Sequence, residues 1–237
     1  MVDGSEVVST TIEDGVAVVR FDDGKANVLS HASIAALGRA LDRAELDARA
    51  VCIVGRPGRM SAGFDLSVMT QGPKAARHLV MEGGDLLMRL FMHPQPVVAA
   101  VTGHALAAGA LLVLSCDVRI GADVPAKIGL NETSIGMPLP LFALELARDR
   151  LDPRHLTRAT LAAEVYDPHG AVAAGYLDRV VAADALVAEA TAEAARLGEY
   201  STSAYAQSKQ VLRQPTIDRV TEGGAADLER FVVETGG

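Results

Sequence analysis

Residues 97–121, VVAAVTGHALAAGALLVLSCDVRIG, form the most apolar part of the chain and carry the strongest signals of secondary structure. Its apolar, β-branched beginning predicts a buried strand over 97–101. The small residues that follow predict a loop over 102–108, and the leucine-rich part predicts a short buried helix over 109–115. A second strand is expected over 118–121. The order strand, loop, helix, strand is typical of layered α/β folds with parallel strands.

The same order occurs once earlier in the chain. A short strand is predicted over 51–54, a turn at 56–58, a small-residue segment over 60–66, and a helix over 75–90 that ends before two prolines. Functional loops in such folds lie at the carboxyl ends of the strands. We therefore expect the small-residue segments to carry the site.

The residues before this unit predict a hairpin and a helix. Residues 8–12 and 16–21 are rich in β-branched side chains and flank an Asp-Gly turn, which predicts a β-hairpin. Ser30 precedes apolar residues at helical spacing and is the expected N-cap of a helix that ends near Asp47.

The residues after 140 predict mainly helices. The exception is one strand over 177–181. Residues 184–213 have a helical composition, and residues 223–233 predict one more helix. No low-complexity linker separates these parts.

The composition excludes several classes of protein. The chain has 237 residues, and its 22 basic and 30 acidic side chains give a net charge of −8. This length is enough to bury roughly 70% of the unfolded surface, and a hydrophobic content of 49% favours a packed core over disorder. The negative charge and the scarcity of aromatic residues argue against a nucleic-acid partner.

Cysteine and histidine usage points to a reduced protein without a predicted metal centre. Cys52 and Cys116 lie in apolar stretches without CxxC spacing, which predicts a cytoplasmic location. The apolar run 97–114 is interrupted at 102–104, so we expect no membrane span. The histidines never occur at HxxxH or HExxH spacing, and no metal site is predicted from them.

Two loops and one carboxylate could carry chemistry. Residues 61–65 (SAGFD) and 103–109 (GHALAAG) lie where a buried strand meets a helix, and backbone N–H groups there can bind an oxyanion. The alternative interpretation of each loop is tight strand-to-helix packing. Glu132 lies between apolar segments, where it is either solvated or buried, and burial would raise its pKa toward that of a useful base.

From about Val8 to Val181 the chain is similar to the crotonase (enoyl-CoA hydratase/isomerase) superfamily. The resemblance rests on three motifs in the family's order and spacing, namely Ala26-Asn27-Val28-Leu29-Ser30, Ser61-Ala62-Gly63-Phe64-Asp65-Leu66 and Cys116-Asp117. It implies an α/β fold, a crotonase-like spiral of ββα turns with a helical C-terminal trimerisation region. We accordingly expect an acyl-CoA-binding core over 1–183 and a helical region over 184–237.

The resemblance also implies an acyl-CoA thioester held between two backbone N–H donors. By the match these belong to Phe64 and Ala108, and Glu132 is the catalytic carboxylate. The substrate-binding residues implied by the match are Lys25, Ala26, Val28, Ala62, Asp65, Leu66 and Leu111. The candidates for contact with the CoA phosphates are Lys25, Arg59 and Lys209. No metal or redox cofactor is implied, since coenzyme A is part of the substrate, and a homotrimer or hexamer is expected.

Departures from the hydratase pattern distinguish two reactions. Hydratases have a Gly-Gly-Gly run followed two positions later by a glutamate, whereas this chain has Ala107-Ala108-Gly109 and Leu111. Leucine cannot position water, but moving a double bond needs only one base. The segment 128–133 also resembles mitochondrial-type delta3,delta2-enoyl-CoA isomerases. We therefore expect a shift of a double bond from C3 to C2; the alternatives are a hydratase or another thioester-enolate enzyme, and a noncatalytic acyl-CoA binding protein.

Several polar residues have structural roles as their first interpretation. We expect Asp65 to cap or anchor its loop, Asp117 to make structural hydrogen bonds, and His104 to be a satisfied, partly buried histidine. Glu82 and Asp85 either face an acyl pocket or belong to a solvated helix face.

Overall fold

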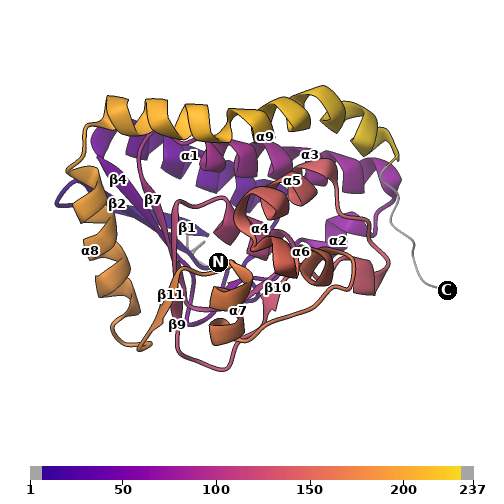
Figure 1. Ribbon diagram of the computed structural model, residues 1–237, viewed down its shortest axis with the longest axis horizontal. Helices are drawn as coiled ribbons and strands as arrows, with labels where there is room; N and C mark the ends of the chain where they lie inside the picture. The colour runs from indigo at the N-terminus through magenta and orange to yellow at the C-terminus, as the bar shows by residue number, and fades with distance from the viewer. Residues whose placement is uncertain (1–6, 231–237) are drawn as a thin grey trace, which may run out of the picture.

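A six-stranded sheet forms the centre of the protein (Figure 1). The computed structural model describes residues 7–230. The strands, in the order β1-β2-β4-β7-β9-β11, are Val8–Glu13, Val16–Phe21, Ala50–Val54, Val97–Val101, Val118–Ala122 and Arg179–Val181. The first pair is antiparallel and every other pair is parallel. The predicted hairpin and the layered α/β fold are confirmed.

A smaller sheet lies beside the first and explains the spiral. It contains β5 (Gly58–Ser61), β8 (Gly103–Leu106) and β10 (Ile128–Gly129), all parallel, in the order β10-β8-β5. The chain passes from β4 to β5, from β7 to β8 and from β9 to β10, entering the large sheet and then the small one each time. This repeated step is the ββα spiral that the resemblance implied. A third pair joins β3 (Val28–Leu29) to β6 (Gly63–Phe64) in parallel.

The prediction of a loop over 102–108 is wrong in part. Residues Gly103–Leu106 form the central strand of the small sheet. Alanine and glycine have weak strand propensity, and the strand is short, so its sequence resembles a loop. Hydrogen bonding to β10 on one side and β5 on the other stabilises the strand, although its residues have weak strand propensity.

Four helices follow the first strands along the chain. They are α1 (His31–Asp47), α2 (Leu66–Met69), α3 (Pro73–Phe91) and α4 (Ala108–Leu114). The predicted N-cap is confirmed, because the Ser30 hydroxyl accepts from the Ser33 amide at 3.3 Å and the Ser33 hydroxyl accepts from the Ser30 amide at 2.8 Å. This reciprocal pair satisfies two N–H groups at the start of α1.

Both faces of the large sheet are covered, which explains its continuous apolar strands. Val51 and Ile53 of β4 belong to the main core together with Leu37 of α1. Cys52 and its neighbours on the other face pack against α8 (Leu186–Gly198), for example at Ala190. Side chains alternate across a strand, so both sets of β4 residues are buried.

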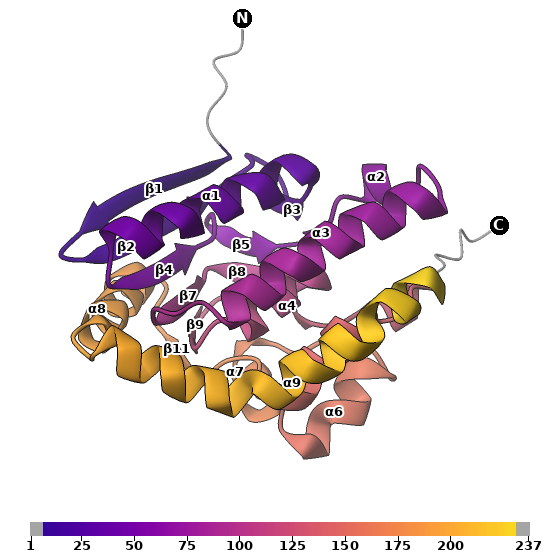
Figure 2. The ribbon, with the colours of Figure 1, turned by 90° about the horizontal axis from the view of Figure 1, so that it is seen from above.

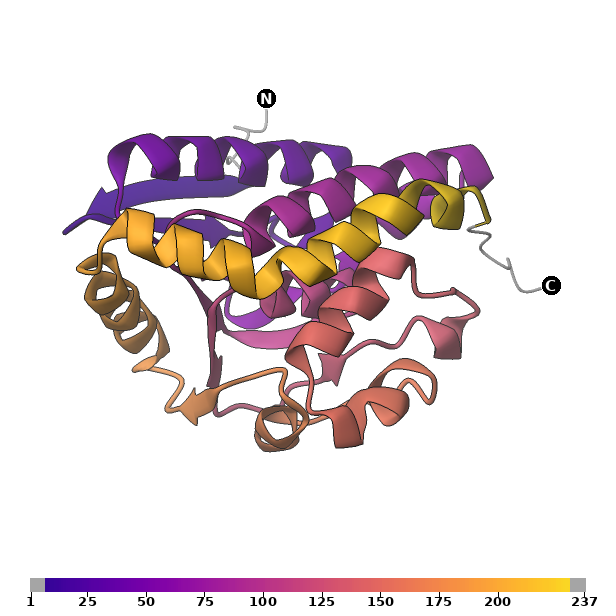
Figure 3. The same ribbon diagram turned by 45° about the horizontal axis from the view of Figure 1, so that its top comes forward.

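The remaining helices form the second half of the chain. They are α5 (Leu141–Arg150), α6 (Pro153–Thr160), α7 (Pro168–Ala174) and α9 (Thr202–Arg230), preceded by a 3-10 turn at Thr133–Ile135. Helix α9 packs along α3 and α5, as two views show (Figures 2 and 3). No helix within residues 7–230 is both long and apolar enough to cross a bilayer.

The predictions for the C-terminal region need two corrections. The predicted helical stretch 184–213 is divided between α8 and α9, and residues 223–230 continue α9 instead of forming a separate helix. Residues 231–233 of that predicted helix lie outside the described residues. The helix continues past Gly223 because it packs closely on α5, where a Cβ at Gly223 would come within 2.6 Å of the Leu141 Cδ2.

A buried ion cluster fastens α9 to the core. Asp117, between α4 and β9, accepts from the Lys209 Nζ at 2.7 Å and pairs with the Arg213 Nη1 at 2.9 Å. Its Oδ2 also accepts from the Val97 amide at 2.8 Å. All three charged side chains are more than nine-tenths buried. The structural role expected for Asp117 is confirmed.

Candidate active site

Three parallel strands of the small sheet bring the predicted catalytic residues together. Phe64 follows β5, Ala108 follows β8 and Glu132 follows β10, each within three residues of the strand's end. Since the three strands are adjacent and parallel, their carboxyl ends meet at one edge. The fold therefore brings the two predicted N–H donors and the predicted catalytic carboxylate to the same edge of the small sheet.

The two donor segments are in direct contact. A Cβ built on Gly63 would lie 2.9 Å from the Ala107 Cβ and 3.2 Å from the Ala108 amide nitrogen. Gly63 has a φ of +95°, which an L side chain rarely adopts. Ala108 is the first residue of α4, and its N–H has no intrahelical partner. A glycine at 63 is thus required both for backbone conformation and for close approach to the second donor.

Ala107 is held in a strained conformation. As the N-cap of α4 it has φ 52° and ψ −129°, a region that favours glycine. Its amide donates to the Gly129 carbonyl of β10 at 3.0 Å. A strained residue tied to a neighbouring strand fixes the direction of the Ala108 N–H, which supports a preorganised site.

Asn27 and Ser61 hold the first donor loop, a role that sequence reasoning missed. Asn27 is fully buried at φ +53°, and its amide nitrogen donates to the Phe21 carbonyl at 2.6 Å. The Ser61 hydroxyl donates to the Asn27 carbonyl at 2.6 Å and accepts from the Gly63 amide at 3.2 Å. The sequence feature that could have revealed this role is the placement of Asn27 and Ser61 within apolar segments, because a polar side chain that becomes buried needs hydrogen-bond partners.

The substrate-binding residues implied by the resemblance lie along this loop. The Ala62 amide donates to the Ala26 carbonyl at 3.0 Å, and Val28 pairs with Gly63 in the β3–β6 ladder. Lys25 is exposed, and its carbonyl accepts from the Arg56 Nη1 at 2.6 Å. Ala26, Val28 and Ala62 are therefore tied to the loop that carries Phe64, and the exposed Lys25 directly precedes Ala26.

The expected phosphate contacts differ in their surroundings. Arg59 is exposed on β5 and remains a candidate. The interpretation of Lys209 is wrong, because its three donors are used by the His93 carbonyl at 2.6 Å, the Gln95 carbonyl at 3.0 Å and Asp117. A buried lysine already paired in this way cannot reach a phosphate in solvent.

The residues after Phe64 have separate roles. Asp65 is the N-cap of α2 and accepts from the Ser67 amide at 2.9 Å and the Ser67 hydroxyl at 2.7 Å, which confirms the capping role. Leu66, the first residue of α2, is 58% exposed. An exposed leucine beside a donor loop is available for an apolar contact with a ligand.

Glu132 is buried, and one of its two carboxylate oxygens lacks a partner. The residue is 8% exposed, and its Oε2 has no hydrogen-bond partner. Burial raises the pKa of Glu132 to about 7, and its own backbone N–H opposes the shift. The alternative of a solvated loop residue is therefore excluded. A carboxylate with a pKa near neutrality is suited to removing and returning a proton.

Burial shields the Glu132 side chain from solvent. Leu111 on α4, the predicted counterpart of the second hydratase glutamate, is almost fully buried. Tyr176 lies near enough that the charge of Glu132 adds to the effect of burial in raising the pKa of the tyrosine. The turn that holds Glu132 is closed by the Met137 amide, which donates to the Glu132 carbonyl at 3.0 Å.

An apolar hollow lies beyond Phe64. Gly83 of α3 faces the Phe64 ring so closely that a Cβ there would collide with it. The next residues, Gly84 and Asp85, line a hollow of about 340 Å³ between α3, α5 and α9. A larger groove of about 780 Å³ adjoins it and shares Met81 as a lining residue. Asp85 lines this hollow and is itself exposed, as expected of a solvated helix face.

The two remaining predictions concern His104 and Glu82. His104 is half-buried and its Nδ1 accepts from the Lys127 amide at 2.9 Å, which confirms a satisfied histidine. Glu82 does not line the hollow of about 340 Å³; it pairs with His31 and with His78, and His78 lines the groove of about 780 Å³.

Comparison with known proteins agrees with this geometry. The family described as "Enoyl-CoA hydratase/isomerase" matches residues 11–235. A relative called enoyl-CoA delta isomerase 1, mitochondrial, from Homo sapiens, is 31% identical over 223 residues, 92% of this chain and 74% of the relative. A putative enoyl-CoA hydratase from Thermus thermophilus is 32% identical over 209 residues, 85% of this chain and 82% of the relative.

A solved structure extends the likeness to three dimensions. The crystal structure of an enoyl-CoA hydratase/isomerase family protein from Pseudomonas syringae is 42% identical, with a TM-score of 0.92 over 95% of this chain and 98% of that one. The family match, the spiral of ββα turns and the paired donor loops all agree. This chain belongs to the enoyl-CoA hydratase/isomerase family, within the crotonase superfamily.

Proposed function

We propose that the protein shifts a double bond of an enoyl-CoA thioester from C3 to C2, with Glu132 as the single base. The observation that carries the proposal is the buried Glu132 carboxylate, whose Oε2 has no partner. The carboxylate removes a proton from C2, and the electron pair moves through the conjugated system to the thioester oxygen as a dienolate. The same carboxyl group then gives the proton to C4, and the double bond forms between C2 and C3.

The dienolate oxygen is the group that needs stabilisation. In the proposal the Phe64 and Ala108 N–H groups both donate to it, and their segments meet at Gly63. Donors fixed before the reaction stabilise developing charge without reorganisation, and one such donor contributes about 3 kcal/mol in comparable sites. The strain at Ala107 supports this assignment, because it fixes the backbone that carries one donor.

Leu111 favours isomerisation over hydration. Hydration requires a positioned water and proton transfer at two carbons, which two carboxylates share in hydratases. Here a buried leucine occupies one of the two positions. Exclusion of water from the dienolate also suppresses side reactions.

The hollows beside α3 supply space for the acyl chain. They begin one residue from the contact between Gly83 and the Phe64 ring, and Met81, Met88 and Leu228 contribute apolar lining. At the other side of the donor loop, the exposed Lys25 and Arg59 are available for the CoA phosphates. The proposed substrate thus lies across the loop, with its acyl part toward α3.

The test is a paired assay on purified protein. A series of 3-enoyl-CoA and 2-enoyl-CoA thioesters is supplied, and double-bond migration and hydration are followed separately. We expect isomerisation to exceed hydration by more than about 100-fold, the scale of one general acid–base contribution. Hydration equal to isomerisation across the series would replace this proposal with the hydratase alternative.

A hydratase is the second candidate function. It is favoured by the relative from Thermus thermophilus, a putative enoyl-CoA hydratase that is 32% identical to this chain. A noncatalytic acyl-CoA binding protein is the third candidate, favoured by Leu111 and the Ala107-Ala108 pair. Acyl-CoA affinity without either turnover would support it.

Assembly into a homotrimer or hexamer is part of the proposal. Helix α9 leaves Val211 and Leu212 about three-quarters exposed on its outer face, a pair that subunit contact would cover. Analytical ultracentrifugation tests this point, and a monomer at micromolar concentration would contradict it.

A further inference from the structure

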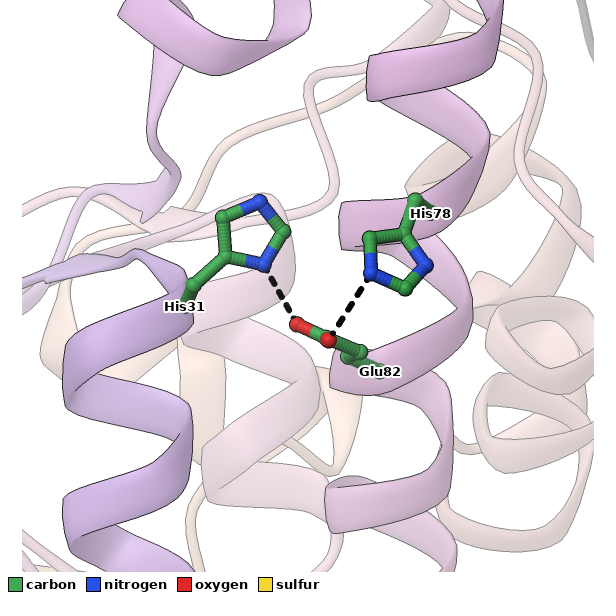
Figure 4. Close-up of side chains that lie close together, drawn as sticks. All are labelled: His31, His78 and Glu82. Carbon is green, nitrogen blue, oxygen red and sulfur yellow. Dashed lines mark hydrogen bonds and ion pairs between the residues drawn. The ribbon is translucent and has the colours of Figure 1, made fainter.

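Three side chains from two helices converge on the surface at the edge of the groove of about 780 Å³, which His78 lines. His31 is the first residue of α1, and His78 and Glu82 lie one turn apart on α3. Figure 4 shows both imidazole rings with a nitrogen directed at the Glu82 carboxylate. The distances are 2.5 Å from the His31 Nδ1 to Oε2 and 3.1 Å from the His78 Nε2 to Oε1.

We propose that His31, His78 and Glu82 form a binding site for a divalent transition metal ion of the Zn²⁺ class. Their ligand atoms all lie within 4.8 Å of one another. A tetrahedral zinc site with bonds of about 2.0–2.1 Å places its ligand atoms about 3.3 Å apart, so small rotations of these side chains bring all three to one ion. Within residues 7–230, no other group of three metal-ligating side chains comes this close together.

The donor set is the reason for the choice of metal. Two imidazoles and one carboxylate suit Zn²⁺, Co²⁺, Ni²⁺ and Cu²⁺, whereas Mg²⁺ and Ca²⁺ require oxygen ligands. The side chains are 44%, 57% and 34% exposed for His31, His78 and Glu82, so an ion can enter from solvent and water can complete its coordination. Asp85 lies close enough to Glu82 for the two carboxyl groups to interact electrostatically, and it adds negative potential that attracts a cation.

A metal ion at this site would join two helices. One ligand comes from α1 and two from α3. Glu82 directly precedes Gly83, which contacts the Phe64 ring. An ion that binds only the folded arrangement of these helices stabilises the native state. The site does not depend on the reaction proposed for Glu132.

The test uses ZnCl₂ with tag-free protein, followed by isothermal titration and thermal unfolding. We expect one equivalent of Zn²⁺ to bind, a melting temperature raised by roughly 3 °C or more at saturation, and reversal by a chelator. MgCl₂ and CaCl₂ should have no such effect. His31→Ala and His78→Ala should each weaken Zn²⁺ binding at least tenfold.

The matched control is His169→Ala, which removes another exposed histidine paired with a carboxylate, Asp123. It should change Zn²⁺ affinity by less than twofold. Unfolding without metal checks that each variant is folded. No stoichiometric Zn²⁺ binding by the unaltered protein, or equal affinity in the His78→Ala variant, would overturn the proposal.

Discussion

Gly63 and Ala107 are packed so closely that a Cβ added to the glycine would come within 2.9 Å of the alanine Cβ. The two residues belong to different turns of the spiral, and each has a positive φ, +95° and 52°. This contact sets the separation of the Phe64 and Ala108 segments. The geometry of the proposed oxyanion hole therefore rests on the absence of one side chain.

Gly63→Ala should lower kcat for isomerisation at least tenfold. The new methyl group would press on Ala107 and on the Ala108 amide. Complete loss of a donor costs roughly 3 kcal/mol, which is about 100-fold in rate, and a displaced donor loses part of that. Steady-state kinetics measures the loss. Gly72→Ala is the control, because Gly72 has a φ of +119° but open space around it. Equal kinetic losses in both variants would show that backbone strain, and not intrusion on the donors, is responsible.

Glu132→Gln should reduce turnover by more than about 100-fold and change acyl-CoA affinity by less than about tenfold. The amide preserves shape but cannot accept the C2 proton. Because the pKa of Glu132 is raised to about 7, kcat/KM of the unaltered protein should rise with pH, reach half its maximum near pH 7 and level off about one pH unit higher. Glu199→Gln, at an exposed position that follows α8, should retain full activity. A folded Glu132→Gln variant with unchanged turnover would remove Glu132 as the base.

The same residue should make stability depend on pH. Its folded-state pKa, about 7, lies above its ordinary value of 4.5, so the native state binds a proton that the unfolded state releases in that range. The free energy of unfolding should fall as pH rises from about 4.5 to about 7, by up to about 3 kcal/mol from this group. Glu132→Gln removes that contribution, so its stability relative to the unaltered protein should be higher at pH 8 than at pH 5. Urea unfolding at the two pH values measures the difference, and a constant difference would mean that the carboxyl is not desolvated.

Leu111→Glu should destabilise the protein by several kcal/mol, since a carboxylate in a leucine pocket lacks partners unless it stays protonated. If it folds, the added carboxylate should increase hydration of 2-enoyl-CoA relative to isomerisation. Leu111→Met is the matched control, with similar volume and no charge. A stable glutamate variant with no gain in hydration would show that Leu111 does not occupy the position of the second hydratase carboxylate.

Asp117→Asn should destabilise the protein by about 3 kcal/mol or more. The change leaves Lys209 and Arg213 buried without a neutralising charge, and removal of one partner from a buried pair costs about 3–5 kcal/mol. Denaturant unfolding measures the effect. Asp218→Asn, an exposed position on α9, should change stability by less than about 0.5 kcal/mol. Similar stabilities for the two variants would contradict the anchoring role.

The sequence was sufficient for the elements with strong local signals. Ser30 capped the predicted helix, and the β-branched run at 97–101 formed the predicted strand. It was insufficient where long-range packing overrides propensity. Residues 103–106 are small and loop-like, yet they pair on both sides, and α9 continues through Pro215.

The residues of the candidate site likewise fall into those that the sequence could predict and those that it could not. Phe64, Ala108 and Glu132 were found by motif, and the topology brings them to one sheet edge. Lys209 was assigned to phosphates because a lysine in sequence shows its charge but not its burial. Its partner is 92 residues away, a separation at which no local pattern is visible. The three side chains of the proposed metal site escaped notice for the same reason, since His31 and Glu82 are 51 residues apart.

The ion cluster at Asp117 also bears on biosynthesis. A ribosome makes the chain from its N-terminus, so the aspartate emerges 92 residues before Lys209. Until α9 follows, the nascent chain has a core carboxylate without the two cations that neutralise it. The packing of α9 against the core can therefore begin only after Lys209 and Arg213 have been made, and a chain truncated before α9 would leave the Asp117 carboxylate without its two cations and would be a target for quality-control proteases.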